Sequence, residues 1–343
     1  MKIDRNSLDE AAREGLISSE QAEPLWQFLR DQSRNTPGFH LTHILYYLGG
    51  LIAIGAMTLF MTLGWERYGG WAIFFIAIAY GVIGLALAEY FLRRGLSIPA
   101  GIMGAFVVAL TPLAIYGLQQ ALGFWVDNAH YRDYHIYIRW NWLLMELGTL
   151  ASGAVLLFRY RLPFMVMPVA VTLWYMSMDL APFLFHDLDL NWDLRKLVSV
   201  WFGLAMILFA FWVDVRSRRE KDFAFWLYLF GVLAFWGGLS LMNSDSELNK
   251  FLYCCINLAM ILVGALISRR VFAVCGGFGV AGYLGYLSYD VFKDSLLFPF
   301  ALTFIGLAVV YVGIVWQKHE QELTRKLRAM LPEGIRRMVE NME

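Results

Sequence analysis

Two acidic residues of this sequence, Glu146 and Asp179, stand inside long apolar stretches. A carboxylate is costly to keep charged in such a stretch, so an ionisable residue there is a candidate functional group. Glu146 has no basic residue four positions away on either side that could pair with it along a helix. We therefore select both carboxylates as candidate ligand-binding residues for a cation or small solute. The alternative is that both are ordinary carboxylates at a membrane interface.

Two other carboxylates have a basic residue one helical turn further along the chain. Arg93 follows Glu89 at i+4 spacing, and Arg218 follows Asp214 at the same spacing. Residues so spaced are neighbours on the surface of a helix. The spacing predicts two ion pairs at a membrane boundary rather than a ligand site.

Further candidate ligand-binding residues lie in two polar segments, 127–142 and 186–193. We single out His135, His186 and Asp187 there, because imidazole and carboxylate groups bind cations and metal ions. Their spacing does not match a known metal-ligand pattern, so we predict no metal site and no cofactor. The Tyr and Trp residues of segment 127–142 favour a simpler role, an aromatic belt at a membrane surface.

A glycine-rich segment late in the chain contains the pattern GxGxxG at Gly277, Gly279 and Gly282. In a dinucleotide site this pattern lies between a strand and a helix, whereas here it lies within an apolar stretch. Glycines also recur there at every third position, which favours close packing of a second helix. We predict that such a packing face is formed by Gly276, Gly279, Gly282 and Gly285.

The sequence offers no support for catalysis or for nucleic-acid binding. It contains no nucleophile elbow, P-loop or metalloprotease helix. Its 28 basic and 28 acidic residues balance, unlike the charge of a typical nucleic-acid-binding domain. Cys254, Cys255 and Cys275 fall in apolar stretches without CxxC spacing, so we interpret them as packing residues.

The amino-acid composition indicates which kind of structural element must position these residues. Of the 343 residues, 59% are hydrophobic and 16% are charged, against about 45–50% and about 25% in soluble domains. This balance predicts an all-α, polytopic integral membrane protein in contact with the lipid bilayer. About ten apolar stretches approach the roughly 20 residues that a membrane-spanning helix needs. The predicted spans are 41–64, 70–92, 97–121, 142–158, 163–182, 196–214, 223–242, 250–268, 271–289 and 295–316.

The basic residues predict the orientation of these spans. Segment 214–222 lies between two spans and carries four of them, which is typical of a cytoplasmic loop. The other short basic turns, at 93–94, 159–161 and 269–270, also follow even-numbered spans and so fall on the same side. The sequence therefore predicts that both termini are cytoplasmic. Ten such spans divide into two sets of five with opposite orientation, as in inverted-repeat transporters, although the halves share no evident sequence similarity.

The first forty residues predict a small helical hairpin. Gly15 is suited to end the first helix, and Ser18 with Gln21 forms a capping-box pattern at the start of the second. Pro24 is comfortable only in a first helical turn, which moves the predicted start of the second helix to Glu23.

These elements predict three parts of the chain. Residues 1–40 form the cytoplasmic hairpin, 41–316 the ten-helix transmembrane domain, and 317–343 a cytoplasmic tail. The tail has an apolar stripe at helical spacing and six basic residues, which suit an amphipathic helix on anionic lipid or against the hairpin. A solvated tail is the alternative.

Two segments carry a resemblance to a known family. One is Glu-Gly-Leu-Ile-Ser-Ser-Glu-Gln-Ala-Glu at 14–23. The other runs from Phe-Pro-Phe-Ala-Leu at 298–302 to Leu-Arg-Ala-Met-Leu-Pro at 327–332. Both resemble bacterial membrane proteins that are grouped as a domain of unknown function by an N-terminal "GLIS-x-EQA" hairpin. The resemblance implies a multi-pass protein of the bacterial inner membrane. It implies no activity and transfers no functional residue.

Three functions are compatible with these features. The first is a transporter-like protein with an outward-facing cation or solute site near Glu146 and Asp179. The second is a scaffold or lipid-associated protein that binds a cytoplasmic protein through residues 1–40 and 317–343. The third is a membrane-embedded enzyme that acts on a lipid-linked substrate through the His- and Asp-rich outer loops, and it predicts loss of turnover when His135 or His186 is changed.

Overall fold

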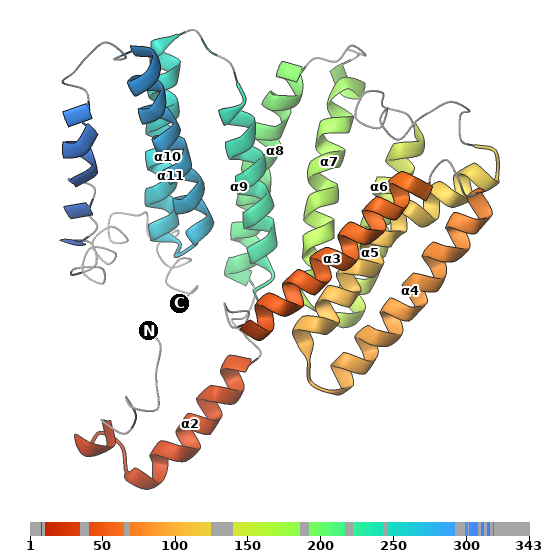
Figure 1. Cartoon of the computed structure of the whole chain (residues 1–343), viewed down its shortest axis with the longest axis horizontal. Helices are drawn as coiled ribbons and strands as arrows, with labels where there is room; N and C mark the ends of the chain where they lie inside the picture. The colour runs from red at the N-terminus through yellow and green to blue at the C-terminus, as the bar shows by residue number, and fades with distance from the viewer. Residues whose placement is uncertain are drawn as a thin grey trace. The chain divides into compact units, whose positions relative to one another are not determined.

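The computed structural model describes residues 8, 11–34, 41–64, 69–124, 140–185, 192–216, 222–242, 244 and 246–291, with isolated positions and short runs between 299 and 318. These residues are predominantly helical and include no β-strand (Figure 1). The prediction of an all-α chain is therefore confirmed for the part of the chain that the structure describes.

Each apolar stretch predicted between residues 41 and 289 lies in a helix. In chain order, the α-helices are α2 Ser19–Arg34, which precedes these stretches, and then α3 Leu41–Gly64, α4 Gly70–Arg93, α5 Ser97–Ala121, α6 Trp140–Tyr160, α7 Val166–Phe185, α8 Trp192–Arg216, α9 Ala224–Ser240, α10 Glu247–Leu266 and α11 Arg270–Tyr286. A short 3-10 helix, Pro163–Met165, precedes α7, and a π-helix, Leu287–Val291, follows α11. The last predicted span, 295–316, lies largely outside the described residues.

Six of the described helices are long and apolar enough to cross a membrane, so the chain is a multi-pass membrane protein. They are Gly70–Arg93, Ser97–Ala121, Asn141–Tyr160, Trp192–Arg216, Glu247–Leu266 and Arg270–Tyr289. Shorter apolar helical segments occur at Leu45–Met57 and Ala224–Ser240. At 1.5 Å per residue, a helix of about 20 residues spans the roughly 30 Å of hydrocarbon in a bilayer.

The chain forms two compact units. Unit 1 comprises Met1–Trp125 and Val155–Met165, and unit 2 comprises Val126–Ala154 and Val166–Glu343. The boundary crosses α6, so the first part of this helix belongs to unit 2 and its end to unit 1. This division does not coincide with the predicted grouping of five plus five spans, whose boundary would follow α7.

In unit 1, α4 and α5 run side by side as an antiparallel pair (Figure 1). Glycine lets the two backbones approach closely, because a Cβ at Gly70 would lie 2.5 Å from the carbonyl oxygen of Gly117. On another side of α5, Ala100 packs with Leu162 and Met165 in a small buried cluster. The start of α5 is thus held between the end of α4 and the segment that follows α6.

In the N-terminal segment, the predicted signals for a helix end and a helix cap can be compared with the structure. Gly15 has a φ of 73°, and the N–H of Leu16 donates to the Ala11 carbonyl at 2.9 Å, so its predicted role at a helix end is confirmed. Gln21 accepts a hydrogen bond from the Ser18 N–H at 3.1 Å, as a capping box requires. Helix α2 begins at Ser19, directly after this capping turn.

The predicted start of the second helix at Glu23 is wrong. Helix α2 begins at Ser19 and contains Pro24 in its interior. Proline lacks the N–H that would bond the carbonyl of Glu20, so the helix gives up one hydrogen bond there. The capping interactions of the preceding turn therefore outweigh the local preference of the proline.

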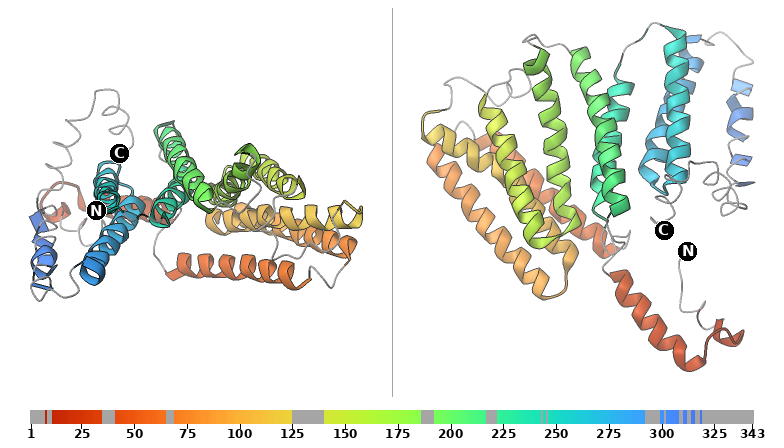
Figure 2. Two further views of the ribbon diagram at one scale, coloured as in Figure 1. Left: turned by 90° about the horizontal axis from the view of Figure 1, so that it is seen from above. Right: turned by 180° about the vertical axis from the view of Figure 1, so that it is seen from behind.

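In unit 2, α8 and α9 approach each other through glycine. A Cβ at Gly203 would lie 2.7 Å from the Gly231 carbonyl oxygen and would collide with the backbone nitrogen of Phe235. A polar chain adds α7 to this pair: the Trp174 indole N–H donates to Ser199 Oγ at 3.1 Å, and Ser199 donates to the Ala234 carbonyl at 2.9 Å. Helices α10 and α11 form a second close pair (Figure 2).

One arginine connects several parts of unit 2. Arg269 lies in the turn between α10 and α11 and makes two hydrogen bonds to Asp214 at the end of α8, of 2.6 and 3.1 Å. Its third contact, of 2.5 Å, is with Asp222, which also accepts the Phe225 N–H at 3.0 Å near the start of α9. Its guanidinium lies 5.2 Å from the centre of the Tyr228 ring. We call these four residues, Asp214, Asp222, Tyr228 and Arg269, the Arg269 junction.

The Arg269 junction changes the interpretation of Asp214. Its expected partner, Arg218, lies outside the described residues, and the structure shows a different partner from a distant turn. Arg269 and Asp214 are only 20% and 11% exposed at their side chains, so this is a largely buried ion pair. Burial by itself would lower the pKa of Arg269, but the hydrogen bonds and charges of Asp222 and Asp214 raise it above its ordinary value. The expected pair of Arg93 with Glu89 is present at 3.9 Å.

Replacing Arg269 by Gln is expected to destabilise the protein by about 3 kcal/mol, because it leaves a buried aspartate without its positive partner. Arg270→Gln is the matched control, since Arg270 is adjacent, equally charged and exposed. Unfolding of the purified protein, followed by circular dichroism during a titration with sodium dodecyl sulfate, measures both effects. Equal stability of the two variants would show that the junction does not hold the helices together.

A methyl group at Gly203 is expected to destabilise unit 2 by about 1–3 kcal/mol, because α8 and α9 must separate to admit it. Gly237→Ala provides the comparison, since a Cβ at Gly237 meets no atom within 4 Å. That change should be neutral, or stabilising by up to about 1 kcal/mol through the higher helix propensity of alanine. The same titration separates the two variants, and a stabilising Gly203→Ala would contradict the close packing.

Candidate functional site

Glu146 belongs to the buried face of α6. Trp142, Met145, Glu146 and Thr149 recur at helical spacing on this helix, and all four are buried. The Thr149 hydroxyl donates a hydrogen bond to the Met145 carbonyl of the same helix at 2.6 Å. Glu146 therefore lies on the buried face of α6.

The Glu146 carboxylate is buried within α6. Its residue is 4% exposed, and neither oxygen has a hydrogen-bond partner among the described residues. A buried polar group normally has a partner, and a buried charge without one costs several kcal/mol. Glu146 therefore differs from Glu89, which is half-exposed and lies near both Arg93 and the Tyr160 hydroxyl.

Asp179 of α7 is an acidic neighbour of Glu146. Glu146 precedes the end of α6 by about as many residues as Asp179 follows the start of α7, so reversal of the chain between the helices brings them to a similar height. Two ionised carboxylates are both acceptors, and a hydrogen bond between them exists only when one carries a proton. Two ionised carboxylates would therefore repel each other, and a proton on one of them would remove this repulsion.

The structure brings together Glu146 and Asp179 from the predicted candidates. The other three, His135, His186 and Asp187, lie outside the described residues. Within the described part of the chain, no group of three or more His, Cys, Asp or Glu side chains is arranged to hold a metal ion. The described candidate site consists of the two carboxylates.

The predicted glycine face divides into two halves. A Cβ at Gly276 would lie 2.5 Å from the Asn257 carbonyl oxygen, and one at Gly279 would collide with the Asn257 side chain. At Gly282 and Gly285, by contrast, a Cβ would meet no atom within 4 Å. Close packing of α11 on α10 in the described residues therefore involves Gly276 and Gly279.

Asn257 fills the space opposite Gly279. It is 1% exposed and donates to the Tyr253 carbonyl of its own helix at 2.8 Å, while its Oδ1 has no hydrogen-bond partner among the described residues. Its Oδ1 lies directly against Gly279. We interpret this contact as helix packing.

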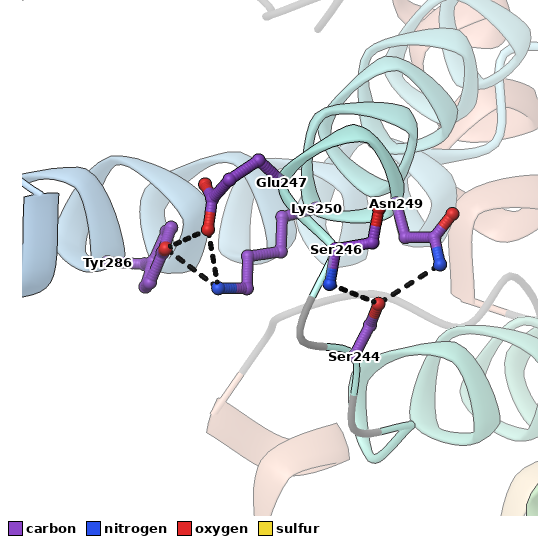
Figure 3. A network of polar contacts seen from close by, with 6 residues as sticks. All are labelled: Ser244, Ser246, Glu247, Asn249, Lys250 and Tyr286. Carbon is purple, nitrogen blue, oxygen red and sulfur yellow. Dashed lines mark hydrogen bonds and ion pairs between the residues drawn. The ribbon is translucent and has the colours of Figure 1, made fainter.

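A polar network that the sequence analysis missed fastens the end of α11 to the start of α10 (Figure 3). Lys250 donates to Glu247 at 2.9 Å and to the Tyr286 hydroxyl at 2.7 Å, and that hydroxyl lies 2.7 Å from the same Glu247 oxygen. Nearby, Ser244 Oγ accepts hydrogen bonds from the Ser246 N–H and the Asn249 amide. The i,i+3 spacing of Glu247 and Lys250 was a usable signal, whereas Tyr286 could not be found that way.

These donors and acceptors hydrogen-bond to one another, so we interpret the network as a structural contact between α10 and α11 rather than a ligand site. Glu146 differs from these residues, because neither of its carboxylate oxygens has a hydrogen-bond partner among the described residues.

Comparison of the chain with protein-family models, with curated proteins and with solved structures finds no match. The family suggested by the segment 14–23 stays a prediction.

Proposed function

We propose that this chain is a transporter-like membrane protein that binds a cation or a small cationic solute at Glu146 and Asp179. The observation that carries the proposal is the Glu146 carboxylate, which is buried without a hydrogen-bond partner among the described residues and lies next to a second carboxylate. Ionisable groups of this kind within membrane helices commonly mark ion or substrate pathways.

The chemistry of the pair favours a ligand with one positive charge. Calcium takes six to eight oxygen ligands, whereas the described residues place two carboxyl groups together here. A proton can be shared by the two carboxyl groups, and a monovalent metal ion or a protonated amine would halve the charge of two ionised carboxylates. Such a cation would replace the repulsion between the carboxylates by attraction to both.

The proposal includes an orientation in the membrane. In this proposal the protein lies in the inner membrane of a bacterial cell, crosses it ten times and has both termini in the cytoplasm. The charge distribution supports this arrangement, because four basic turns follow even-numbered predicted spans. Glu146 lies about 9 Å from the start of α6, at 1.5 Å per residue, which in this orientation is nearer the outer surface.

Glu146→Gln is expected to abolish stabilisation of the protein by its cation while leaving the helices intact, because Gln keeps the size of the side chain and removes its charge. The measurement is the thermal unfolding midpoint of detergent-purified protein with Na⁺, K⁺, Li⁺ or protonated amines. A ligand that binds only the folded wild type at 100 times its Kd adds about 2.7 kcal/mol of stability. Asp179→Asn should produce the same loss.

Glu89→Gln is the matched control for this experiment. It removes the same charge from a half-exposed carboxylate in α4 and should retain the stabilisation by cation. Loss of the effect in all three variants would indicate a general response to charge. No stabilisation of the wild type by any cation, with stabilisation by lipid alone, would favour the scaffold or lipid-associated function instead.

A further inference from the structure

Unit 1 gathers four arginines from two distant turns at one end of its helices. Arg93 and Arg94 lie at the end of α4, while Arg159 and Arg161 lie at and just after the end of α6. The two turns share one buried cluster, in which Phe91 and Leu92 pack against the same residues as Tyr160. We call Arg93, Arg94, Arg159 and Arg161 the arginine cluster.

A polar contact also connects the two turns. The Tyr160 hydroxyl donates to Glu89 Oε2 at 3.4 Å, and Arg93 Nη2 lies 3.9 Å from Glu89 Oε1. Packing and hydrogen bonding together therefore hold arginines that are far apart in the sequence within one surface region.

This region has an excess of positive charge. Segments 86–100 and 155–165 contain the four arginines and one acidic residue, Glu89. All four arginines are exposed. An anionic partner would lower the repulsion among them, and the planar guanidinium fork suits the oxygens of a phosphate group.

Three of these arginines lie over aromatic rings. The guanidinium carbon of Arg94 is 4.6 Å from the centre of the Tyr90 ring, that of Arg159 is 5.2 Å from Tyr160, and that of Arg161 is 6.0 Å from Phe158. A cation–π contact uses the face of the guanidinium and leaves its in-plane N–H groups able to donate. The contacts of Arg94 and Arg159 therefore position these two guanidinium groups without using the N–H groups that could bind an anion.

Exposed apolar groups adjoin the charges. Phe158 is 79% exposed, Tyr90 47% and Leu96 39%. These residues lie at or next to the ends of helices that are apolar enough to span a membrane. A partner that fits this surface must offer negative oxygens and hydrocarbon side by side.

The start of α5 contributes to the same region. This helix begins at Ser97, directly after the turn that carries Arg94, and Leu96 at its N-cap position provides no side-chain hydrogen bond to the first turn. The first backbone N–H groups of a helix carry partial positive charge and favour an anion. The α5 terminus therefore adds to the field of the arginines.

We propose that the arginine cluster binds the phosphate of an anionic phospholipid, with the lipid chain against Phe158, Tyr90 and Leu96. The joint presence of charge and exposed hydrocarbon favours a lipid over free phosphate, which would leave the apolar groups uncovered. Basic regions between membrane helices on the cytoplasmic side are suited to anionic headgroups. This lipid site is independent of the Glu146 and Asp179 pair.

The test compares lipid binding to full-length protein in a neutral detergent by native mass spectrometry. The probe is dioleoyl-phosphatidylglycerol, with dioleoyl-phosphatidylcholine as the neutral lipid. The variant Arg94→Gln/Arg159→Gln should bind phosphatidylglycerol about 30-fold more weakly, since each basic residue near an anionic lipid contributes roughly fivefold. Binding of phosphatidylcholine should not change. Arg93 is retained because it pairs with Glu89.

Arg13→Gln/Arg216→Gln is the matched control, because it removes two exposed arginines and Arg216 likewise lies over a ring, 5.5 Å from Trp212. This control should lose less than threefold in affinity. Equal losses in the two double variants, equal wild-type affinity for both lipids, or full displacement of the lipid by inorganic phosphate would overturn the proposal.

If Arg94→Gln/Arg159→Gln does not fold, Arg94→Lys/Arg159→Lys preserves the charges and removes the planar forks. Its affinity for phosphatidylglycerol should fall between the affinities of the wild type for phosphatidylglycerol and for phosphatidylcholine. Binding of phosphatidylglycerol as tight as that of the wild type would overturn the assignment of the phosphate to these guanidinium groups.

Discussion

Unit 2 depends on a single guanidinium group, that of Arg269. It holds Asp214 at the end of α8 and Asp222 before α9, and it reaches both from the turn between α10 and α11. The edge-to-face contact of Tyr228 with Phe272, with ring centres 5.7 Å apart, adds an apolar contact between α9 and α11. Because two carboxylates share this arginine, the ends of several helices are fixed together although they are distant in the sequence.

Within the helices, the contacts follow from the apolar surroundings. Lipid is as apolar as leucine, so close packing and local hydrogen bonds hold membrane helices together. Gly203 and Gly276 allow backbone approach in the α8–α9 and α10–α11 pairs, while Ser199 satisfies both Trp174 and a carbonyl of α9. Against this background, an ionisable group such as Glu146, buried beside Asp179, has no evident structural use.

The two proposed sites both place charged groups near hydrocarbon, but they differ in the sign of the charge and in its exposure. Glu146 is buried beside the partly exposed Asp179, so the ligand proposed for this pair is a cation that enters the protein. The arginine cluster is exposed, and its charges lie on aromatic rings where an anionic headgroup can reach them.

The sequence by itself determined the features that depend on neighbouring residues. Hydrophobic runs located the helices between residues 41 and 289, Gly15 marked a helix end, and the lack of a nearby basic residue singled out Glu146. The start of α2 was predicted wrongly, because the capping turn at Ser18 outweighs Pro24. Only the tertiary structure decided that Asp214 pairs with Arg269, that Gly203 faces Gly231, and that Arg94 and Arg159 share a surface. The physical reason is that similar apolar helices carry no sequence signal for which of them become neighbours, whereas a cap or an apolar run depends on residues a few positions apart.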